Sequence, residues 1–586
     1  MTGDTSMNTT SPLDTCVILL GSLDLAYRDR AIAYHAQQGL STRVIDAGEG
    51  TSTPRSLLQA LDQIEAAFVV LADDSDFLLP EALQQAHAWL RAHPQAAGVQ
   101  GYALGMRPGN GTVSYLRFGE TAHEQLEEQG VRERVLAHAR SGLQPWRALL
   151  RVDALRAALA EAEVQQDWRI GLSLALLYRF ELPVLEHTLL VSECRGDHPD
   201  ADALAPTLRA LRQWDEQQGG HFDDEEGFAV LRQFVLATAA AGEQPLVFES
   251  PWSSVEQAPV RQFEARQFVE LPYYNAQVFR QLTALEFLVH AWPVGRQHLR
   301  AVEGAWVRQR DLLVRQANDS AQSLCARYWE ALSINLFSPQ VCRSLLQVLD
   351  DDQSEVRAEL GRWLDRLEQV PAPEVSAQLA ETPSGRVLEA LAAATLSSAA
   401  KQRVHKRIAA SKALRIGLFV LDLDDDDAAL QRTFDSIVLS GLRDVRIVVL
   451  KAGKLPAITT VRDTLHFVKV TAENVVSHLN HLAGQLPCEW LMRLQAGDEL
   501  AGSGLLRLQL ELAQAQGVKA VCGNDVQRDE DGRLVAVLRP GADIDLLRSR
   551  PDLMAPHWLL QRDTLMQVGA SVRPAMARSI WMCCFG

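Results

Sequence analysis

The run Ala67-Phe68-Val69-Val70-Leu71-Ala72-Asp73-Asp74-Ser75-Asp76-Phe77 joins an apolar segment directly to three carboxylates. Its apolar part predicts a buried β-strand, and ligands of open α/β sheets bind at the carboxyl ends of strands. Carboxylates packed this closely repel one another unless a cation lies among them, and Mg²⁺ and Mn²⁺ prefer oxygen ligands. We therefore predict a divalent-metal site at Asp74 and Asp76. The alternative is an acidic turn that starts the helix expected over 80–92.

Strand and helix patterns alternate on both sides of this run. Strands are expected at 16–21, 41–45, 67–71 and 98–104, and helices at 27–38, 54–65 and 80–92. Strands that alternate with helices of this length favour a mostly parallel, helix-covered sheet, which we expect over residues 15–200. Asp46 follows the second strand, where its carboxylate could accept hydrogen bonds from a base or a ribose. A simple turn before Gly48 is the alternative for Asp46.

The rest of the chain suggests three further regions after a polar, disordered start at 1–14. Residues 201–412 carry mainly helical periodicity, with a linker near 370–385 where Pro, Ser, Thr and Gly cluster. An α/β pattern restarts at 413 and runs to 570, in an order that echoes the first domain. The tail, 571–586, fits no strand or helix pattern; we interpret it as the product of a frameshift or truncation, with a native tail as the alternative.

Composition narrows the function classes. A net charge of -17 argues against a nucleic-acid partner. The eight cysteines show no CxxC spacing, so neither a zinc site nor a disulfide framework is expected. We expect no transmembrane helix and no signal peptide, and hence a cytoplasmic protein. The basic stretch within 386–412 is either a solvated helix face or a contact with an anionic surface such as a membrane.

Three segments together resemble the nucleotide-sugar half of a GT-A, family-2-like bacterial glycosyltransferase. They are Val17–Gly21 with Arg28-Asp29-Arg30, then Val44-Ile45-Asp46, then Leu71–Phe77. The resemblance implies a nucleotide-sugar donor contacted by Arg30, Asp46 and Asp73, and an Mn²⁺ or Mg²⁺ ion on Asp74 and Asp76.

The later part of this domain resembles the acceptor half of the same family. Pro145–Arg151 is similar to the acceptor-side strand, and Asp167 takes the place of the catalytic base for inverting transfer. His198, in a loop, is a further candidate for the metal or the diphosphate; an ordinary loop histidine and a helix N-cap are the alternatives for His198 and Asp167. The chain departs from the family where Gln166 replaces an acidic residue and Gly21-Ser22 replaces the usual first turn.

The second α/β region resembles a degenerate, incomplete GT-A domain. Trp490–Leu500 is similar to the strand and metal motif but keeps only Asp498, and Lys451 stands where an aspartate is usual. We do not expect this region to be catalytic.

Three functions remain open at this point. The first is transfer of a sugar to a glycan, a lipid carrier or a protein such as flagellin. The second is a non-catalytic interaction scaffold built on degenerate glycosyltransferase domains. The third, nucleotidyl transfer, ranks lowest because Gly21-Ser22-Leu23-Asp24 is not a Gly-rich, basic phosphate-binding loop.

Overall fold

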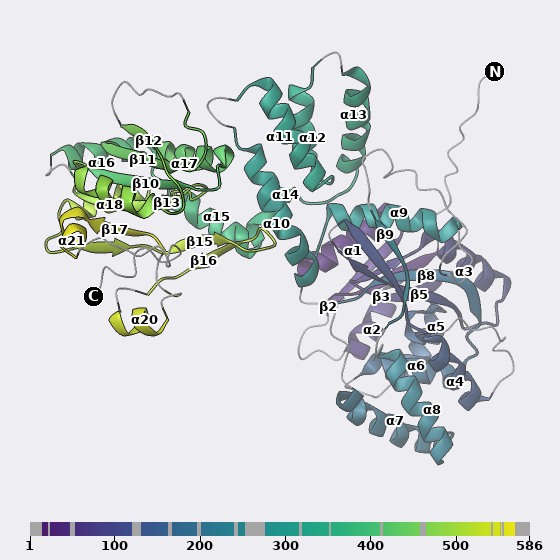
Figure 1. Cartoon of the computed structure of the whole chain (residues 1–586). Helices are drawn as coiled ribbons and strands as arrows, with labels where there is room; N and C mark the ends of the chain where they lie inside the picture. The colour runs from purple at the N-terminus through teal and green to yellow at the C-terminus, as the bar shows by residue number, and fades with distance from the viewer. Residues whose placement is uncertain are drawn as a thin grey trace, which may run out of the picture. The chain divides into compact units, whose positions relative to one another are not determined.

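The chain forms two compact units, Met1–Val375 (unit 1) and Ser376–Gly586 (unit 2). The computed structural model describes residues 14–21, 24–46, 53–109, 111–119, 130–161, 167–195, 201–239, 244–251, 273, 276–315, 319–350, 353–410, 414–456, 464–540, 543–550, 553 and 556–568. Each unit is described by itself below (Figure 1).

Unit 1 is built on a mixed sheet in the order β2-β1-β3-β7-β5-β6-β9, with β8 on β5 and β4 on β8. The strands are β1 (Thr15–Gly21), β2 (Ser41–Asp46), β3 (Phe68–Asp73), β4 (Asp76–Leu78), β5 (Gly98–Pro108), β6 (Thr112–Arg117), β7 (Leu149–Arg151), β8 (Val184–Glu193) and β9 (Leu246–Pro251). β1 pairs in parallel with β2 and β3, whereas β7 runs antiparallel to both β3 and β5. The carboxyl ends of β1, β2 and β3 therefore meet at one edge.

Helices cover both faces of this sheet. The helices of unit 1 are α1 (Leu25–Gln37), α2 (Thr53–Leu61), α3 (Pro80–Ala92), α4 (Val131–Ser141), α5 (Val152–Glu161), α6 (Trp168–Arg179), α7 (Ala205–Gln218), α8 (Glu225–Thr238), α9 (Ala276–Ala291), α10 (Arg296–Leu313), α11 (Ala321–Ile334), α12 (Pro339–Val348) and α13 (Ser354–Glu368), with 3₁₀ turns at Pro145–Arg147 and Ala201–Leu204. Of these, α1 to α9 contribute to the two cores of the sheet.

The side chains of β1 alternate between two hydrophobic cores. Val17 and Leu19 pack with α1, α3 and α9, whereas Ile18 and Leu20 pack with α2, α5, α6 and α8. Burial on both faces explains why the strand is a continuous apolar run, and each fully buried Leu or Ile contributes about 1.5–3 kcal/mol.

The region after residue 200 differs from the separate helical region that we expected. β9 extends the unit 1 sheet by pairing with β6, and α7, α8 and α9 complete the two cores of that sheet. Helices α11, α12 and α13 form a third core, which includes Tyr328 and Trp363. The helical prediction holds for these later helices, but α7, α8, β9 and α9 pack as part of the first α/β domain.

The stretch 370–385 contains helical residues as well as the division between the units. α14 (Val375–Glu381) and the start of α15 (Pro383–Ala394) lie in it. Thr382 and Pro383 start a helix: Thr382 Oγ1 accepts a hydrogen bond from the Gly385 backbone amide at 3.1 Å, and Pro383 begins α15.

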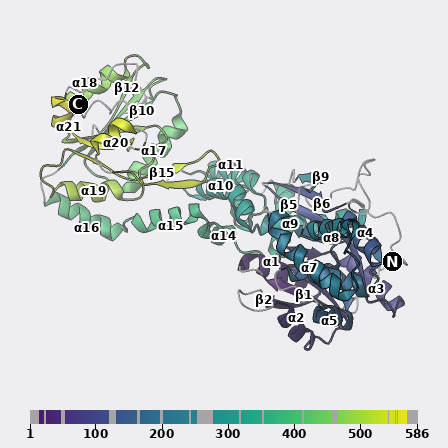
Figure 2. The ribbon, with the colours of Figure 1, turned by 90° about the horizontal axis from the view of Figure 1, so that it is seen from below.

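Unit 2 has a second, smaller sheet in the order β12-β11-β10-β13-β17-β14. The strands are β10 (Ile416–Asp422), β11 (Val445–Lys451), β12 (Leu465–Lys469), β13 (Trp490–Gln495), β14 (Ala520–Cys522) and β17 (Trp558–Gln561), with a separate hairpin of β15 (Asp525–Arg528) and β16 (Leu534–Val537). The helices after α15 are α16 (Ser398–Ala409), α17 (Asp427–Ser440), α18 (Val475–Gln485), α19 (Gly504–Leu512), α20 (Ile544–Ser549) and α21 (Arg562–Gln567). Figure 2 shows α16 and α19 side by side.

The two sheets share one strand plan. The order β2-β1-β3-β7-β5 in unit 1 matches β11-β10-β13-β17-β14 in unit 2, and the fourth strand of each runs antiparallel to its neighbours. The predicted α/β fold with a second α/β domain is therefore confirmed.

Candidate functional site

The acidic run lies where the sequence placed it, at the carboxyl end of β3. Asp73 is the last residue of β3 and lies opposite Leu20 of β1. The Asp76 carboxylate accepts a hydrogen bond from the Asp73 backbone amide at 2.8 Å, which closes the turn between them. Asp46 ends β2 at the same edge, but its side chain lies outside the described part of the structure, as does the whole of His198.

Arg147 bridges two of the carboxylates. Its Nη2 atom lies 2.9 Å from Asp76 Oδ1 and 3.5 Å from Asp73 Oδ2. Asp76 is fully buried, and burial raises the pKa of its carboxyl group while the Arg147 charge opposes that shift. Arg147 also bonds to the Gln144 side chain and donates to Ser192 Oγ at 3.4 Å. Several buried partners thus fix this guanidinium.

Asp73 and Asp74 have further arginine partners. Arg169 Nη2 lies 2.5 Å from Asp73 Oδ1, and Arg195 pairs with Asp74, which is 1% exposed. Burial works against the charge on Arg195, but the Asp74 carboxylate together with Tyr27 and Asp73 favours it, so the pKa of Arg195 is raised overall. Each of the three carboxylates therefore faces a guanidinium.

A divalent cation does not fit these carboxylates as they are arranged. A metal clamp needs carboxylate oxygens that converge on one point at roughly 2.0–2.2 Å. Both oxygens of Asp76 are already engaged, and Asp74 is paired with an arginine. Among the described residues, convergent acidic groups of three or more are found at one place, Asp422, Asp425 and Asp427 in unit 2. The repulsion that led us to predict Mn²⁺ or Mg²⁺ is offset here by arginines, and the metal requirement stays a prediction.

Arg30, expected to contact the nucleotide, lies in the core instead. It is on the inward face of α1, where it pairs with Glu193 and donates to the Trp292 carbonyl oxygen at 3.1 Å. The rings of Tyr27 and Phe77 flank its guanidinium. Burial raises the pKa of Glu193, and the Arg30 charge opposes that shift. We therefore assign Arg30 a structural role, because contact with a ligand would break a buried ion pair.

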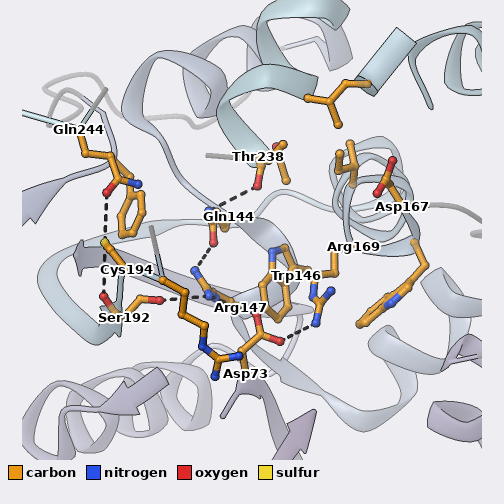
Figure 3. Close-up of a pocket in the computed structure, with 16 residues that line it drawn as sticks. Asp73, Gln144, Trp146, Arg147, Asp167, Arg169, Ser192, Cys194, Thr238 and Gln244 are labelled. Carbon is orange, nitrogen blue, oxygen red and sulfur yellow. Dashed lines mark hydrogen bonds and ion pairs between the residues drawn. The ribbon is translucent and has the colours of Figure 1, made fainter. Parts of the chain in front are cut away.

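A pocket of about 400 Å³ opens beside Asp73. Arg147, Arg169 and Arg195 line it together with Asp73 and Asp167 (Figure 3). It lies at the carboxyl edge of β3, and the elements that bring these side chains together are far apart in the chain.

Two Trp-Arg dipeptides, Trp146-Arg147 and Trp168-Arg169, form part of the pocket wall. The first lies in the segment that resembles the acceptor-side strand, but the sequence predicted no ligand contact for either. The Trp146 ring lies between two guanidinium groups, with Arg147 Cζ at 4.5 Å and Arg169 Cζ at 5.2 Å from the ring centre (Figure 3). Trp168 lies 5.1 Å below Arg169 Cζ. The recurring Trp-Arg pair is the signal that could have identified these residues, since cation–π stacking fixes a guanidinium in place.

Asp167 faces the same pocket. It occupies the N-cap position of α6, but its side chain makes no capping hydrogen bond. Its carboxylate instead accepts a hydrogen bond from the Thr207 hydroxyl, and Asp167 is partly exposed. The Thr207 hydroxyl thus orients the Asp167 carboxylate within the pocket, and this carboxylate does not cap α6.

The equivalent edge of unit 2 carries different chemistry. Strand register places His557 at the position of Arg147, and Asp498 at that of Asp76. His557 Nε2 lies 3.5 Å from Asp498 Oδ2, so the basic–acidic contact is kept. The backbone amide of Gln495 donates a hydrogen bond to Asp498 Oδ2 at 2.6 Å. The Asp73 amide and the Asp76 carboxylate form the equivalent turn in unit 1.

Lys451 occupies the position that Asp46 has in unit 1. It ends β11 opposite Asp422, as Asp46 ends β2 opposite Gly21. Lys451 Nζ lies 2.5 Å from Asp422, 2.6 Å from Asp425 and 2.9 Å from Asp427. An internal ammonium group therefore sits among the acidic cluster of unit 2.

No family model and no curated protein matches the chain. Three crystal structures of residues 1–349 of TarS from S. aureus, one with UDP-GlcNAc, one with UDP and one whose description names no ligand, align with 61% of this chain and 90% of their own. They are 12% identical to it, with TM-scores of 0.26, 0.25 and 0.25. Such TM-scores are too low to carry an argument. In the part of the chain that the structure describes, no helix is long and apolar enough to cross a membrane.

Proposed function

We propose that unit 1 is a GT-A-type glycosyltransferase that transfers a sugar from a nucleotide-sugar to a hydroxyl group, with the pocket beside Asp73 as its active site. The observation that carries the proposal is one pocket that joins Asp73, at the carboxyl end of β3, to Asp167, at the start of α6. These are the donor-side and acceptor-side carboxylates of the family that the sequence resembles. The proposal includes a cytoplasmic location and a glycan, lipid carrier or protein as acceptor.

Asp167 is the proposed catalytic base for inverting transfer. The acceptor hydroxyl oxygen attacks the anomeric carbon, the bond from that carbon to the diphosphate oxygen breaks, and the hydroxyl proton passes to the Asp167 carboxylate. The Thr207 hydroxyl orients this carboxylate before the acceptor arrives. The departing diphosphate carries the negative charge, so the donor side of the pocket must supply positive groups.

The alternative function, a non-catalytic interaction scaffold, is favoured for unit 2 alone. There Lys451 replaces the strand-end aspartate, and its ammonium group is held by Asp422. A nucleoside would meet a basic, internally paired side chain at this edge. We propose that unit 2 is a structural or interaction domain.

The test is calorimetric titration of the full chain with a panel of nucleoside diphosphates and nucleotide-sugars, followed by an assay for nucleoside diphosphate release. Asp167→Asn should bind the same nucleotide as wild type but lose turnover. Asp62→Asn, on the surface of unit 1 outside the pocket, is the matched control and should retain both. A well-folded wild-type chain that binds no member of the panel would overturn the proposal.

A further inference from the structure

We propose that the diphosphate of the donor is bound directly by Arg147, Arg169 and Arg195, without a bridging divalent cation. This inference rests on the function proposed above and specifies how the donor is recognised. It assigns the carboxylates of the acidic run a different task from metal binding.

Three arginines from separate elements converge on one pocket. Arg147 ends the 3₁₀ turn before β7, Arg169 lies in the first turn of α6, and Arg195 follows β8. A guanidinium presents five N–H donors in a planar fork that matches phosphate oxygens, and it does not lose its proton in proteins. Arg169 and Arg195 each pair with one carboxylate in the described structure, which leaves several of their donors for a ligand. Arg147 already bonds to Asp76, Gln144 and Ser192 and therefore offers fewer.

Two of the arginines retain unsatisfied donors. Arg147 is 8% exposed, and its Nε atom has no hydrogen-bond partner among the described residues. The Nε atom of Arg169 is likewise without a described partner. A buried donor without a partner is costly, and here it belongs to two side chains that line the pocket.

The carboxylates act as positioning residues for the guanidinium groups. Asp74 and Asp76 are buried, at 1% and 0% exposed, and each pairs with an arginine that lines the pocket. A cation would have to displace Arg195 or Arg147 from these carboxylates. For Arg147, which is buried, this would leave the guanidinium without its partner.

Hydrogen bonding, rather than net charge, is then the basis of binding. Three aspartates balance three arginines in this cluster, so the pocket has no large positive charge of its own. The oriented donors are fixed by carboxylates and by the Trp146 and Trp168 rings before the ligand arrives. Such preorganised donors suit a leaving group whose charge grows as its bond breaks.

The experiment measures nucleoside diphosphate binding by the full chain in EDTA and again in excess Mn²⁺, using UDP, GDP, CDP, ADP and TDP as probes. Equal affinity within about twofold in the two buffers is expected for the nucleotide that binds. The parent nucleoside of that nucleotide is titrated in parallel, because it lacks the phosphates that the arginines contact.

Arg169→Gln is the informative variant because the Arg169 side chain is 39% exposed, so its loss spares the fold. We expect diphosphate affinity to fall at least about tenfold, as for the loss of a charge-assisted hydrogen bond, with nucleoside affinity unchanged. Arg156→Gln is the matched control: its side chain is 40% exposed and it pairs with Asp153 and Asp62 outside the pocket. This control should bind like wild type.

The outcomes separate the two proposals. Binding that needs Mn²⁺ and disappears in EDTA would overturn the arginine site while leaving the proposed function intact. Equal loss of nucleoside and nucleotide affinity in Arg169→Gln would also overturn it. No binding in either buffer would overturn the proposed function itself, and this inference with it.

Discussion

Lys451→Met should destabilise unit 2. Among the described contacts, Lys451 carries the one positive charge that is paired with the buried carboxylate of Asp422. The Asp422 side chain is 0% exposed, and Lys451 Nζ lies 2.5 Å from it. Breaking a buried ion pair by removing one partner costs about 3–5 kcal/mol. Asp425 and Asp427 have side chains that are 52% and 88% exposed, so solvent screens them and each adds less than about 1 kcal/mol. We expect a total loss of about 3–5 kcal/mol.

The same variant should acquire a dependence on divalent cations. Without the ammonium group, Asp422, Asp425 and Asp427 keep ligand oxygens within 4.8 Å of one another. If the cluster of the variant binds Mn²⁺, a free Mn²⁺ concentration 100 times the Kd would raise its free energy of unfolding by about 2.7 kcal/mol. Wild type should show no such response, since Lys451 occupies the centre of the cluster.

The assay is hydrogen exchange followed by mass spectrometry across a urea series, read on peptides from β10 and β11. Lys451→Met/Asp422→Asn is the control, because it removes both members of the buried pair and should be more stable than Lys451→Met. A loss below about 1 kcal/mol in Lys451→Met would refute the assignment of Asp422 as a buried charge that needs its partner. An equal Mn²⁺ response in wild type would refute the idea that the lysine excludes cations.

Three further predictions concern unit 1. Asp167→Asn should lower kcat by at least about 100-fold while nucleotide affinity stays within twofold, as measured by steady-state kinetics and calorimetry; equal turnover would exclude Asp167 as the base. Arg147→Met should cost about 3–5 kcal/mol of unfolding free energy in urea, and adding Asp76→Asn should recover part of it, because Asp76 is buried beside Arg147. Burial lowers the pKa of His35 to about 4, so the unfolded chain takes up its proton first and stability falls as pH drops from about 6.5 towards 4. His35→Phe should therefore reduce the stability lost between pH 7 and pH 5 by about 2 kcal/mol; an unchanged loss would show that His35 is not the group responsible.

Much of the fold could be predicted from local pattern. The apolar runs at β1 and β3 are buried on both faces of a sheet, so every residue in them is hydrophobic and the strands are easy to recognise. β9 was missed because Leu246–Pro251 is short and gains its partner only by pairing with β6, more than a hundred residues earlier. Periodicity within a segment carries no information about such a partner.

The site could be predicted only in part, for the same reason. Asp73 and Asp167 were predicted because each lies beside a recognisable element, and both line the pocket, although their roles stay predictions. The arginine partners of the acidic run could not be inferred, since Arg195 and Asp74 are separated by 121 positions. A sequence shows that carboxylates are crowded, but only the fold shows whether a metal or a side chain neutralises them. The burial of Arg30 could not be predicted, because a helix pattern alone did not show that its position faces the core.

The insertion of β7 between β3 and β5 has a consequence for how the chain assembles. β3 and β5 precede β7 in the chain, yet neither has its neighbour on that side until Leu149–Arg151 arrives. Until then both strands present unpaired backbone groups, which can pair with another chain. Closing contacts across so many residues is slow, so this interval is long compared with helix formation. Unit 2 repeats the arrangement, with β17 entering between β13 and β14. The chain therefore passes twice through a state in which the middle of a sheet is its most aggregation-prone part.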